Sequence, residues 1–135
     1  MKKVIVFLTF FSFLFSYSLE DGIKQIKEKK YQKALKTYMQ IAKDGMIAKY
    51  NIGYLFENGL GVKKDIKKAL QFYQMSANDG YDKAALLVGN AYIKGIGVKK
   101  DIRKAIYYYK IAAKEGNKKA IKILNIIKNK LKEKK

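Results

Sequence analysis

Asn58-Gly-Leu-Gly-Val-Lys-Lys-Asp65 returns almost unchanged as Lys94-Gly-Ile-Gly-Val-Lys-Lys-Asp101, 36 residues further along the chain. Self-similarity at a fixed period between about 20 and 50 residues is typical of proteins built from stacked repeats. Each repeat is then one supersecondary unit that buries its apolar face against its neighbours. The repeated stretch therefore predicts a solenoid.

Apolar residues spaced for amphipathic helices lie on both sides of each copy of this stretch. The Gly-x-Gly segment is therefore predicted to be the turn of a helical hairpin, in which glycine provides positive φ angles. Asp65 and Asp101 are placed to cap the second helix of each hairpin. The residues expected to define the repeat are Gly53, Gly59, Gly61, Asp65, Ala69, Gly80, Gly89, Gly95, Gly97, Asp101, Ala105 and Gly116.

Shorter segments flank the two full units. Residues 20–29 predict a short, weakly apolar helix, and a second amphipathic helix begins at Tyr31 and is expected to end at Gly45. Asn117 is expected to start a last helix that closes the array, with a Lys-rich end over 128–135 that frays in solvent. The prediction is an all-α, α/α solenoid of about seven antiparallel helices: a divergent first repeat, two full repeats and a capping helix.

The N-terminus predicts export. Met1-Lys2-Lys3 is followed by an apolar run over 4–15 and by Ser16-Tyr17-Ser18, the pattern of a secretory signal peptide. We expect a signal peptide over 1–18, a solenoid domain over 19–135, a periplasmic or secreted location, and no stable membrane insertion after cleavage. The alternative is a retained anchor, although the run is shorter than the roughly 20 residues of a membrane span.

The chain is strongly basic, with 30 Lys and Arg against 11 Asp and Glu and a formal net charge of +19. Two interpretations stay open: lysines that simply solvate every helix, or a field that attracts an acidic partner. Nucleic acid is not expected for an exported chain. Because His and Cys are absent, common zinc sites, Ser-His-Asp catalysis and disulfides are excluded, and no metal or cofactor is expected.

The spacing of these residues resembles the Sel1-like repeat family, relatives of the tetratricopeptide repeats. The match rests on Ala48, Gly53, Phe56, Gly59, Gly61, Val62, Asp65, Ala69, Tyr73, Ala77 and Gly80, and on Ala84 or Ala85, Gly89, Tyr92, Gly95, Gly97, Val98, Asp101, Ala105, Tyr109, Ala113 and Gly116. The resemblance implies a concave surface that holds a protein or peptide partner.

A weaker resemblance links the chain to the cysteine-rich Helicobacter branch of the same family, whose members are described as β-lactamase-like. That branch staples its units with Cys pairs eight residues apart, at positions similar to Ala77 and Ala85, Ala113 and Ile121, and Ala42 and Lys49 here. This chain has no Cys at any of them.

The expected function is that of an exported, monomeric, non-catalytic scaffold. Thr37 and Ser76 are the only hydroxyls of Ser or Thr after residue 18, and neither lies in a recognisable catalytic motif. Alternatives are a β-lactam-binding or β-lactamase-like protein and an envelope-stabilising protein that binds anionic wall polymer. Residues expected to face the partner-binding groove are Tyr50, Asn51, Tyr54, Leu87, Asn90, Lys94, Tyr107 and Tyr108.

Overall fold

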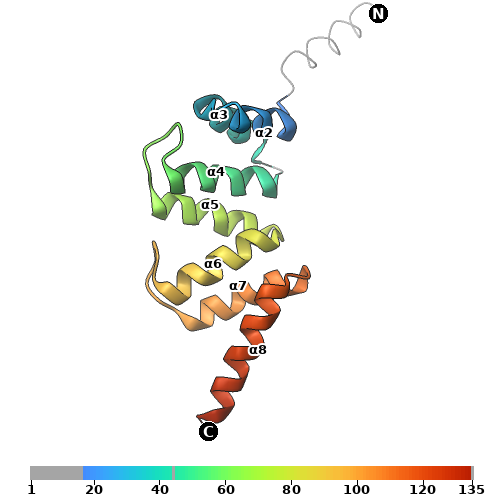
Figure 1. The fold of residues 1–135 in the computed structure, drawn as a ribbon, viewed down its shortest axis with the longest axis vertical. Helices are drawn as coiled ribbons and strands as arrows, with labels where there is room; N and C mark the ends of the chain where they lie inside the picture. The colour runs from blue at the N-terminus through green and yellow to red at the C-terminus, as the bar shows by residue number, and fades with distance from the viewer. Residues whose placement is uncertain (1–16, 44, 135) are drawn as a thin grey trace, which may run out of the picture.

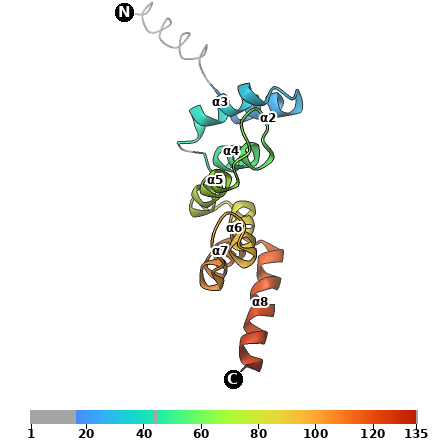
Figure 2. The ribbon, with the colours of Figure 1, turned by 90° about the vertical axis from the view of Figure 1, so that its left-hand side faces the viewer.

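The computed structural model describes residues 17–43 and 45–134. Within these ranges the chain forms seven α-helices and no strand, which confirms the all-α solenoid (Figure 1). Three antiparallel hairpins follow one another along the long axis, and a final helix leans on the last of them (Figures 1 and 2). The helices are α2 (Leu19–Lys27), α3 (Tyr31–Ile41), α4 (Met46–Asn58), α5 (Ile66–Asn78), α6 (Asp82–Lys94), α7 (Ile102–Lys114) and α8 (Lys118–Glu133).

Two kinds of contact build the stack. Within each unit the first helix packs against the second, in the pairs α2 with α3, α4 with α5, and α6 with α7. Between units the second helix packs against the first helix of the next unit, in the pairs α3 with α4, α5 with α6, and α7 with α8. Each helix of the interior is therefore covered on two sides, whereas α8 has a neighbour on one side.

A glycine facing a tyrosine fixes the packing inside each unit. A Cβ added at Gly53 would lie 2.7 Å from the Tyr73 ring, and one added at Gly89 would lie 2.5 Å from the Tyr109 ring. Atoms that close would overlap, so the helices can approach this far only because glycine has no side chain. The repeat residues Gly53 and Gly89 thus serve as seats for a buried aromatic ring.

The first hairpin contains the same pair, which the sequence analysis did not identify. A Cβ added at Gly22 of α2 would overlap the ring of Tyr38 on α3. The residues between the two helices are only 28–30, where the second unit has 59–65. The divergent first repeat is therefore a shortened repeat that keeps the seat and lacks the glycine loop.

The Gly-x-Gly loops join neighbouring units. Gly61 and Gly97 have φ angles of 66° and 71°, which favour glycine. A Cβ at Gly61 would lie 2.6 Å from the backbone nitrogen of Gln32, and one at Gly97 would lie 3.2 Å from Ile66. Each loop therefore rests on the start of the preceding unit's second helix.

The predicted helix caps are confirmed. The Asp65 carboxylate accepts a hydrogen bond from the backbone N–H of Lys68 at 2.9 Å. The Asp101 carboxylate accepts from Arg103 at 2.9 Å and Lys104 at 3.0 Å. These bonds satisfy amide groups of the first turn, which have no partner inside the helix.

Glycines follow α5 and α7 as expected, but the prediction for Gly45 is wrong. Gly80 and Gly116 have φ angles of 94° and 84° just after those helices end. By contrast, α3 ends at Ile41, and Gly45 is the N-cap of α4 with an extended φ of −119°. Gly45 is therefore equivalent to Tyr81, the N-cap of α6, and not to Gly80.

The predicted signal peptide lies almost wholly outside the described residues, because the description starts at Tyr17. Ser18 caps α2, accepting a hydrogen bond from the backbone N–H of Asp21 at 3.1 Å. At the other end, α8 is helical through Glu133, past the point where the Lys-rich end was expected to fray. No helix in the described part of the chain is long and apolar enough to cross a membrane.

Candidate functional site

A hollow of about 220 Å³ lies where α5 meets α6. Its lining combines apolar side chains with the Glu57 carboxylate from α4 and the Lys94 ammonium from α6. The predicted groove residues Leu87, Asn90 and Lys94 all line it, so the fold brings these three together. The full lining is Glu57, Ile66, Ala69, Leu70, Tyr73, Leu87, Asn90, Ala91, Lys94 and Ile96.

The packing of the repeats fixes the polar groups of this hollow. The Tyr73 hydroxyl donates a hydrogen bond to Glu57 at 2.6 Å, and the Tyr109 hydroxyl donates to the Asn90 side-chain oxygen at 2.8 Å. Both tyrosines are the rings seated on glycine in the core. Glu57 and Asn90 are therefore held by groups that cannot move without disturbing the hairpins.

Burial raises the pKa of Tyr73, and its hydrogen bond to Glu57 raises that pKa further. An ionised phenol in this position would be poorly solvated and would face a carboxylate. Tyr73 therefore remains a neutral hydrogen-bond donor, and Glu57 remains an acceptor aimed at the hollow.

A cluster of tyrosines adjoins the hollow through Tyr73. The ring of Tyr50 lies 5.4 Å from that of Tyr73 and 5.2 Å from that of Tyr81, edge-on to the latter. Burial raises the pKa of Tyr50, with smaller contributions from Tyr81, Glu57 and Tyr54. Tyr54 is 41% exposed and the predicted residue Asn51 is half-buried on the same helix. Aromatic rings with polar tips are well suited to contact a partner.

Tyr107 and Tyr108 lie outside the hollow between α5 and α6. Tyr108 is buried and stacks on Tyr92 with ring centroids 5.8 Å apart, whereas Tyr107 is 57% exposed and meets Tyr108 edge-on. Lys104 places its ammonium 5.5 Å above the Tyr92 ring. These residues do not line the hollow, so the predicted groove set falls into two groups.

Glu57 and Tyr81 were not among the residues predicted from the sequence. Glu57 follows Gly53 by four residues and so lies on the face that receives Tyr73. That spacing is a signal from which Glu57 could have been identified. Tyr81 is the N-cap of α6, outside any helical periodicity, and nothing in the sequence alone placed it beside Tyr50.

The two hydroxyls considered for catalysis are fully buried and hydrogen-bonded. The Thr37 hydroxyl donates to the Gln25 side-chain oxygen at 2.9 Å, and the Ser76 hydroxyl donates to the Met46 carbonyl at 2.7 Å. In this arrangement neither oxygen can reach a substrate. The part of the chain that is described also holds no cluster of three acidic, His or Cys residues that could bind a metal.

The positions that resemble the stapled Cys pairs are held by other contacts. Ala77 and Ala85 are both fully buried in the core. Lys49 is buried and forms an ion pair with Asp79, which links α4 to the end of α5. Apolar packing of Ala77 and Ala85 thus joins two units at one of these positions, whereas the Lys49–Asp79 ion pair lies within a single unit.

The family model of the Sel1 repeat matches residues 47–81 and 82–117. These ranges contain the second and third hairpins. The shortened first hairpin and α8 lie outside them.

Solved structures resemble the chain over most of its length. A Sel1 repeat protein from Oxalobacter formigenes is 34% identical with a TM-score of 0.75, over 82% of this chain and 46% of that one. Cysteine-rich protein B of Helicobacter pylori is 28% identical with a TM-score of 0.66, over 69% of this chain and 71% of that one.

A curated relative matches a shorter stretch. The component HRD3 of an ERAD-associated E3 ubiquitin-protein ligase from Candida glabrata is 50% identical over 46 residues, which are 33% of this chain and 6% of that protein. This chain therefore spans less than half the length of the Oxalobacter protein and a small fraction of HRD3.

Proposed function

The chain belongs to the Sel1 repeat family, and from that premise we propose that it is an exported scaffold that binds a protein or peptide partner on its concave face without catalysing a reaction. Sel1 repeat chains are scaffolds that typically mediate protein–protein contacts. The observation that carries the proposal is the hollow between α5 and α6, which combines an apolar floor with fixed polar groups.

The chemistry of the hollow indicates the kind of segment it would bind. Leu70, Leu87 and Ala91 offer an apolar surface for one or two side chains of a partner. Lys94 on the rim favours a carboxylate beside those side chains. The Asn90 oxygen accepts from Tyr109, which leaves its amide N–H groups to donate to a partner's backbone. A short extended segment with apolar and acidic side chains fits these groups.

Export rests on the pattern of residues 1–18. Cleavage after Ser18 would remove the cap of α2 and leave the ammonium of Leu19 at the helix start, at a cost of about 1 kcal/mol. Mass determination of the N-terminus of the protein recovered from cells tests this proposal. A mature chain beginning at Leu19 would support it, and an intact Met1 in the cytoplasm would contradict it.

The test of the binding site compares two lysines of α6, one that lines the hollow and one that does not. Partners captured from envelope extract would be identified, and their affinity measured for the unaltered protein, Lys94→Glu and Lys83→Glu. Lys83 is exposed on the same helix as Lys94 and is not among the residues that line the hollow. We expect Lys94→Glu to weaken binding by about tenfold or more and Lys83→Glu to have little effect. Equal affinities of all three proteins would place the partner elsewhere.

The second candidate, β-lactam binding or hydrolysis, is favoured by the likeness to the Helicobacter cysteine-rich protein. The buried hydroxyls of Thr37 and Ser76 do not supply a nucleophile for it. Nitrocefin hydrolysis by the same preparation, with and without Ser76→Ala, decides between the two. Turnover that follows the purified protein would overturn the non-catalytic proposal.

A further inference from the structure

The junction between α7 and α8 repeats the junction between α5 and α6 at a distance of 36 residues, with one change that alters its chemistry. Across α5 and α6, the Gln74 side-chain amide donates a hydrogen bond to the Tyr92 hydroxyl at 3.0 Å. The equivalent positions are Lys110 on α7 and Lys128 on α8. Two ammonium groups cannot hydrogen-bond to each other, and like charges repel. The hydrogen bond that joins α5 to α6 is therefore absent between α7 and α8. We call the α5–α6 junction the inner junction and the α7–α8 junction the outer junction.

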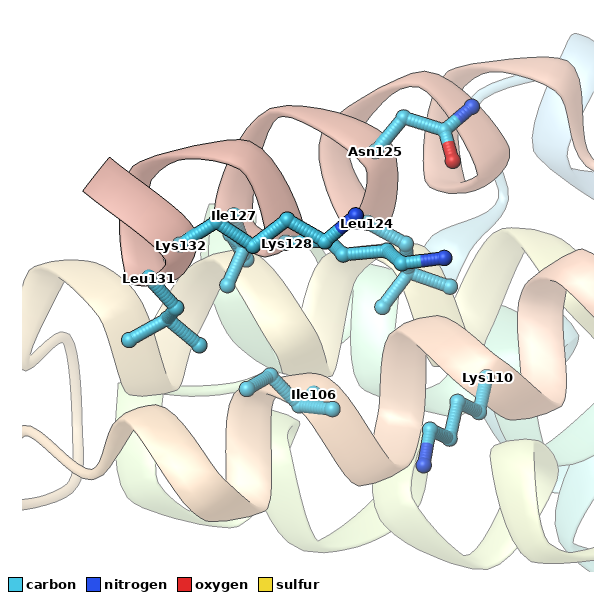
Figure 3. Close-up of a pocket in the computed structure, with 8 residues that line it drawn as sticks. All are labelled: Ile106, Lys110, Leu124, Asn125, Ile127, Lys128, Leu131 and Lys132. Carbon is cyan, nitrogen blue, oxygen red and sulfur yellow. The ribbon is translucent and has the colours of Figure 1, made fainter. Parts of the chain in front are cut away.

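The outer junction is correspondingly open. A hollow of about 410 Å³ lies between α7 and α8, compared with about 220 Å³ at the inner junction. Figure 3 shows Leu124, Ile127 and Leu131 pointing from α8 toward α7, with Ile106 facing them. A second hollow of about 370 Å³ adjoins it, lined by Ile102, Ile127, Lys130, Leu131, Glu133 and Lys134. We call the two together the terminal groove.

Apolar side chains of this groove are exposed to an unusual degree for a repeat junction. Ile102 and Leu131 are each 52% exposed, and Ile106, Leu124 and Ile127 are half-buried. Leaving these side chains in water forgoes the free energy that their burial would supply. An apolar floor of this kind marks a surface that a partner can cover.

The rim of the groove has one sign of charge. Lys110, Lys128 and Lys132 surround the larger hollow, and Lys130 and Lys134 border the smaller. Glu133 is the one carboxylate among the residues that line the two hollows. A segment that covers the floor must therefore bring negative charge to the rim, or leave five ammonium groups facing an apolar surface.

We propose that the terminal groove binds an acidic amphipathic helix of a partner protein. Its apolar side chains would cover the floor formed by Ile106, Leu124 and Ile127, in the manner of a helix laid in a groove. A carboxylate of the helix would bridge Lys110 and Lys128, replacing the Gln74–Tyr92 bond of the inner junction. This site is separate from the hollow between α5 and α6.

The charges and shape of the groove disfavour other occupants. A second copy of this chain would set one lysine rim against another, in a molecule of net charge +19. A further repeat does not fit on the outer side of α8, because Asn125 stands where Gly89 of α6 seats a tyrosine. A bilayer favours protruding apolar and aromatic residues, whereas this floor is recessed between helices and residues 118–135 include no aromatic residue.

The test uses the protein as recovered from expressing cells and two synthetic helical peptides. Both have leucines at helical spacing. One carries glutamates beside the leucines, and the other carries glutamines at the same positions. We expect the glutamate peptide to bind about tenfold or more tightly than the glutamine peptide at low salt, with the difference falling as salt rises. Methyl NMR should show shifts at Ile106, Leu124 and Ile127.

Charge reversal then locates the site. Lys110→Glu/Lys128→Glu should lose the glutamate peptide and bind a version of that peptide with lysine in place of glutamate. Lys67→Glu/Lys83→Glu reverses the same number of exposed lysines on other helices and should behave like the unaltered protein. Lys94→Glu, which alters the hollow between α5 and α6, should also leave peptide binding unchanged.

Three outcomes would overturn the proposal. One is equal binding of the glutamate and glutamine peptides by the unaltered protein. Another is binding to phosphatidylglycerol vesicles that buries α8 and displaces the glutamate peptide, which would assign the groove to lipid. The last is a concentration-dependent dimer that Leu131→Asp dissociates, which would assign it to a second copy. Circular dichroism of each variant separates loss of binding from loss of fold.

Discussion

α6 and α8 occupy the same place in successive units but have different surroundings. α6 is covered by α5 on one side and α7 on the other, whereas α8 packs mainly against α7. The sequence differs where the structure does: Gly89, Tyr92 and Ala91 of α6 correspond to Asn125, Lys128 and Ile127 of α8. The ring seat and the hydrogen-bonding tyrosine are lost, while the apolar stripe is kept and enlarged.

This difference shows what a helix needs in order to receive a neighbour on each side. A helix that must receive neighbours on both sides needs glycine for close approach and aromatic rings to fill the junction. α8 keeps the apolar side that faces α7 and carries several lysines on its other sides. The terminal groove follows from that exchange, because the stripe of α8 is longer than α7 can cover.

Converting the inner junction into a copy of the outer one should have the largest effect. Gln74→Lys/Tyr92→Lys removes the hydrogen bond across α5 and α6 and the stacking of Tyr92 on Tyr108. We expect the free energy of unfolding to fall by about 3 kcal/mol in urea titrations, mainly from the lost aromatic burial. A loss below about 1 kcal/mol would mean that the junction does not depend on this pair.

Substituting a glycine that faces a buried tyrosine ring should have the second-largest effect on stability. Gly89→Ala places a Cβ 2.5 Å from the Tyr109 ring, so the helices must separate, and we expect a loss of about 2 kcal/mol. At the equivalent position of α8, Asn125→Ala should change stability by less than about 0.5 kcal/mol. Similar losses for both substitutions would show that α8 is packed as tightly as α6.

Alkaline pH should weaken the hairpins through the seated tyrosines. Burial raises the pKa of Tyr38 to about 12 from an ordinary value of 10.0, so the folded state holds this proton longer than the unfolded state. The contribution is complete below about pH 10 and is lost as pH rises toward 12. At pH 11 the stability already lost amounts to about 1 kcal/mol. Urea titrations at pH 8 and 11 should show a smaller loss for Tyr38→Phe than for the unaltered protein.

Closing the outer junction should have the smallest effect on stability and a clear effect on binding. Lys110→Gln/Lys128→Tyr installs the residues found at the inner junction, removes two positive charges from the Lys-rich rim and should raise stability by about 0.5–1 kcal/mol. The same variant should lose the glutamate peptide. Thermal unfolding and peptide titration on one preparation check both results, and unchanged peptide affinity would contradict the role given to these lysines.

Most of the fold could be predicted from the sequence, because its determinants are local and repeated. The twin glycine loops, the Asp65 and Asp101 caps and the helical stripes each identify one element, and the 36-residue period relates them. The role of Gly22 was not predicted, because the shortened loop over 28–30 breaks the 36-residue period. Gly45 was misassigned because both a helix stop and an N-cap accept glycine.

The candidate site could be predicted only in part, because it depends on contacts between units. Leu87, Asn90 and Lys94 were identified from the face of one helix, and they do lie together. Tyr108 was expected near that groove, but stacking on Tyr92 takes it to a different surface. The open junction at Lys110 and Lys128 is recognised only from the contacts that their equivalents, Gln74 and Tyr92, make between α5 and α6.

Hydrogen–deuterium exchange of α6 and α8 in the same molecule tests most directly the claim that α8 presents an open apolar face that binds an acidic helix. We expect slow exchange along α6 and fast exchange in the second half of α8, from about Ile127 to Glu133, with the glutamate peptide slowing exchange in α8 and not in α6. Exchange in free α8 as slow as in α6 would mean that its face is already covered, and would contradict the account.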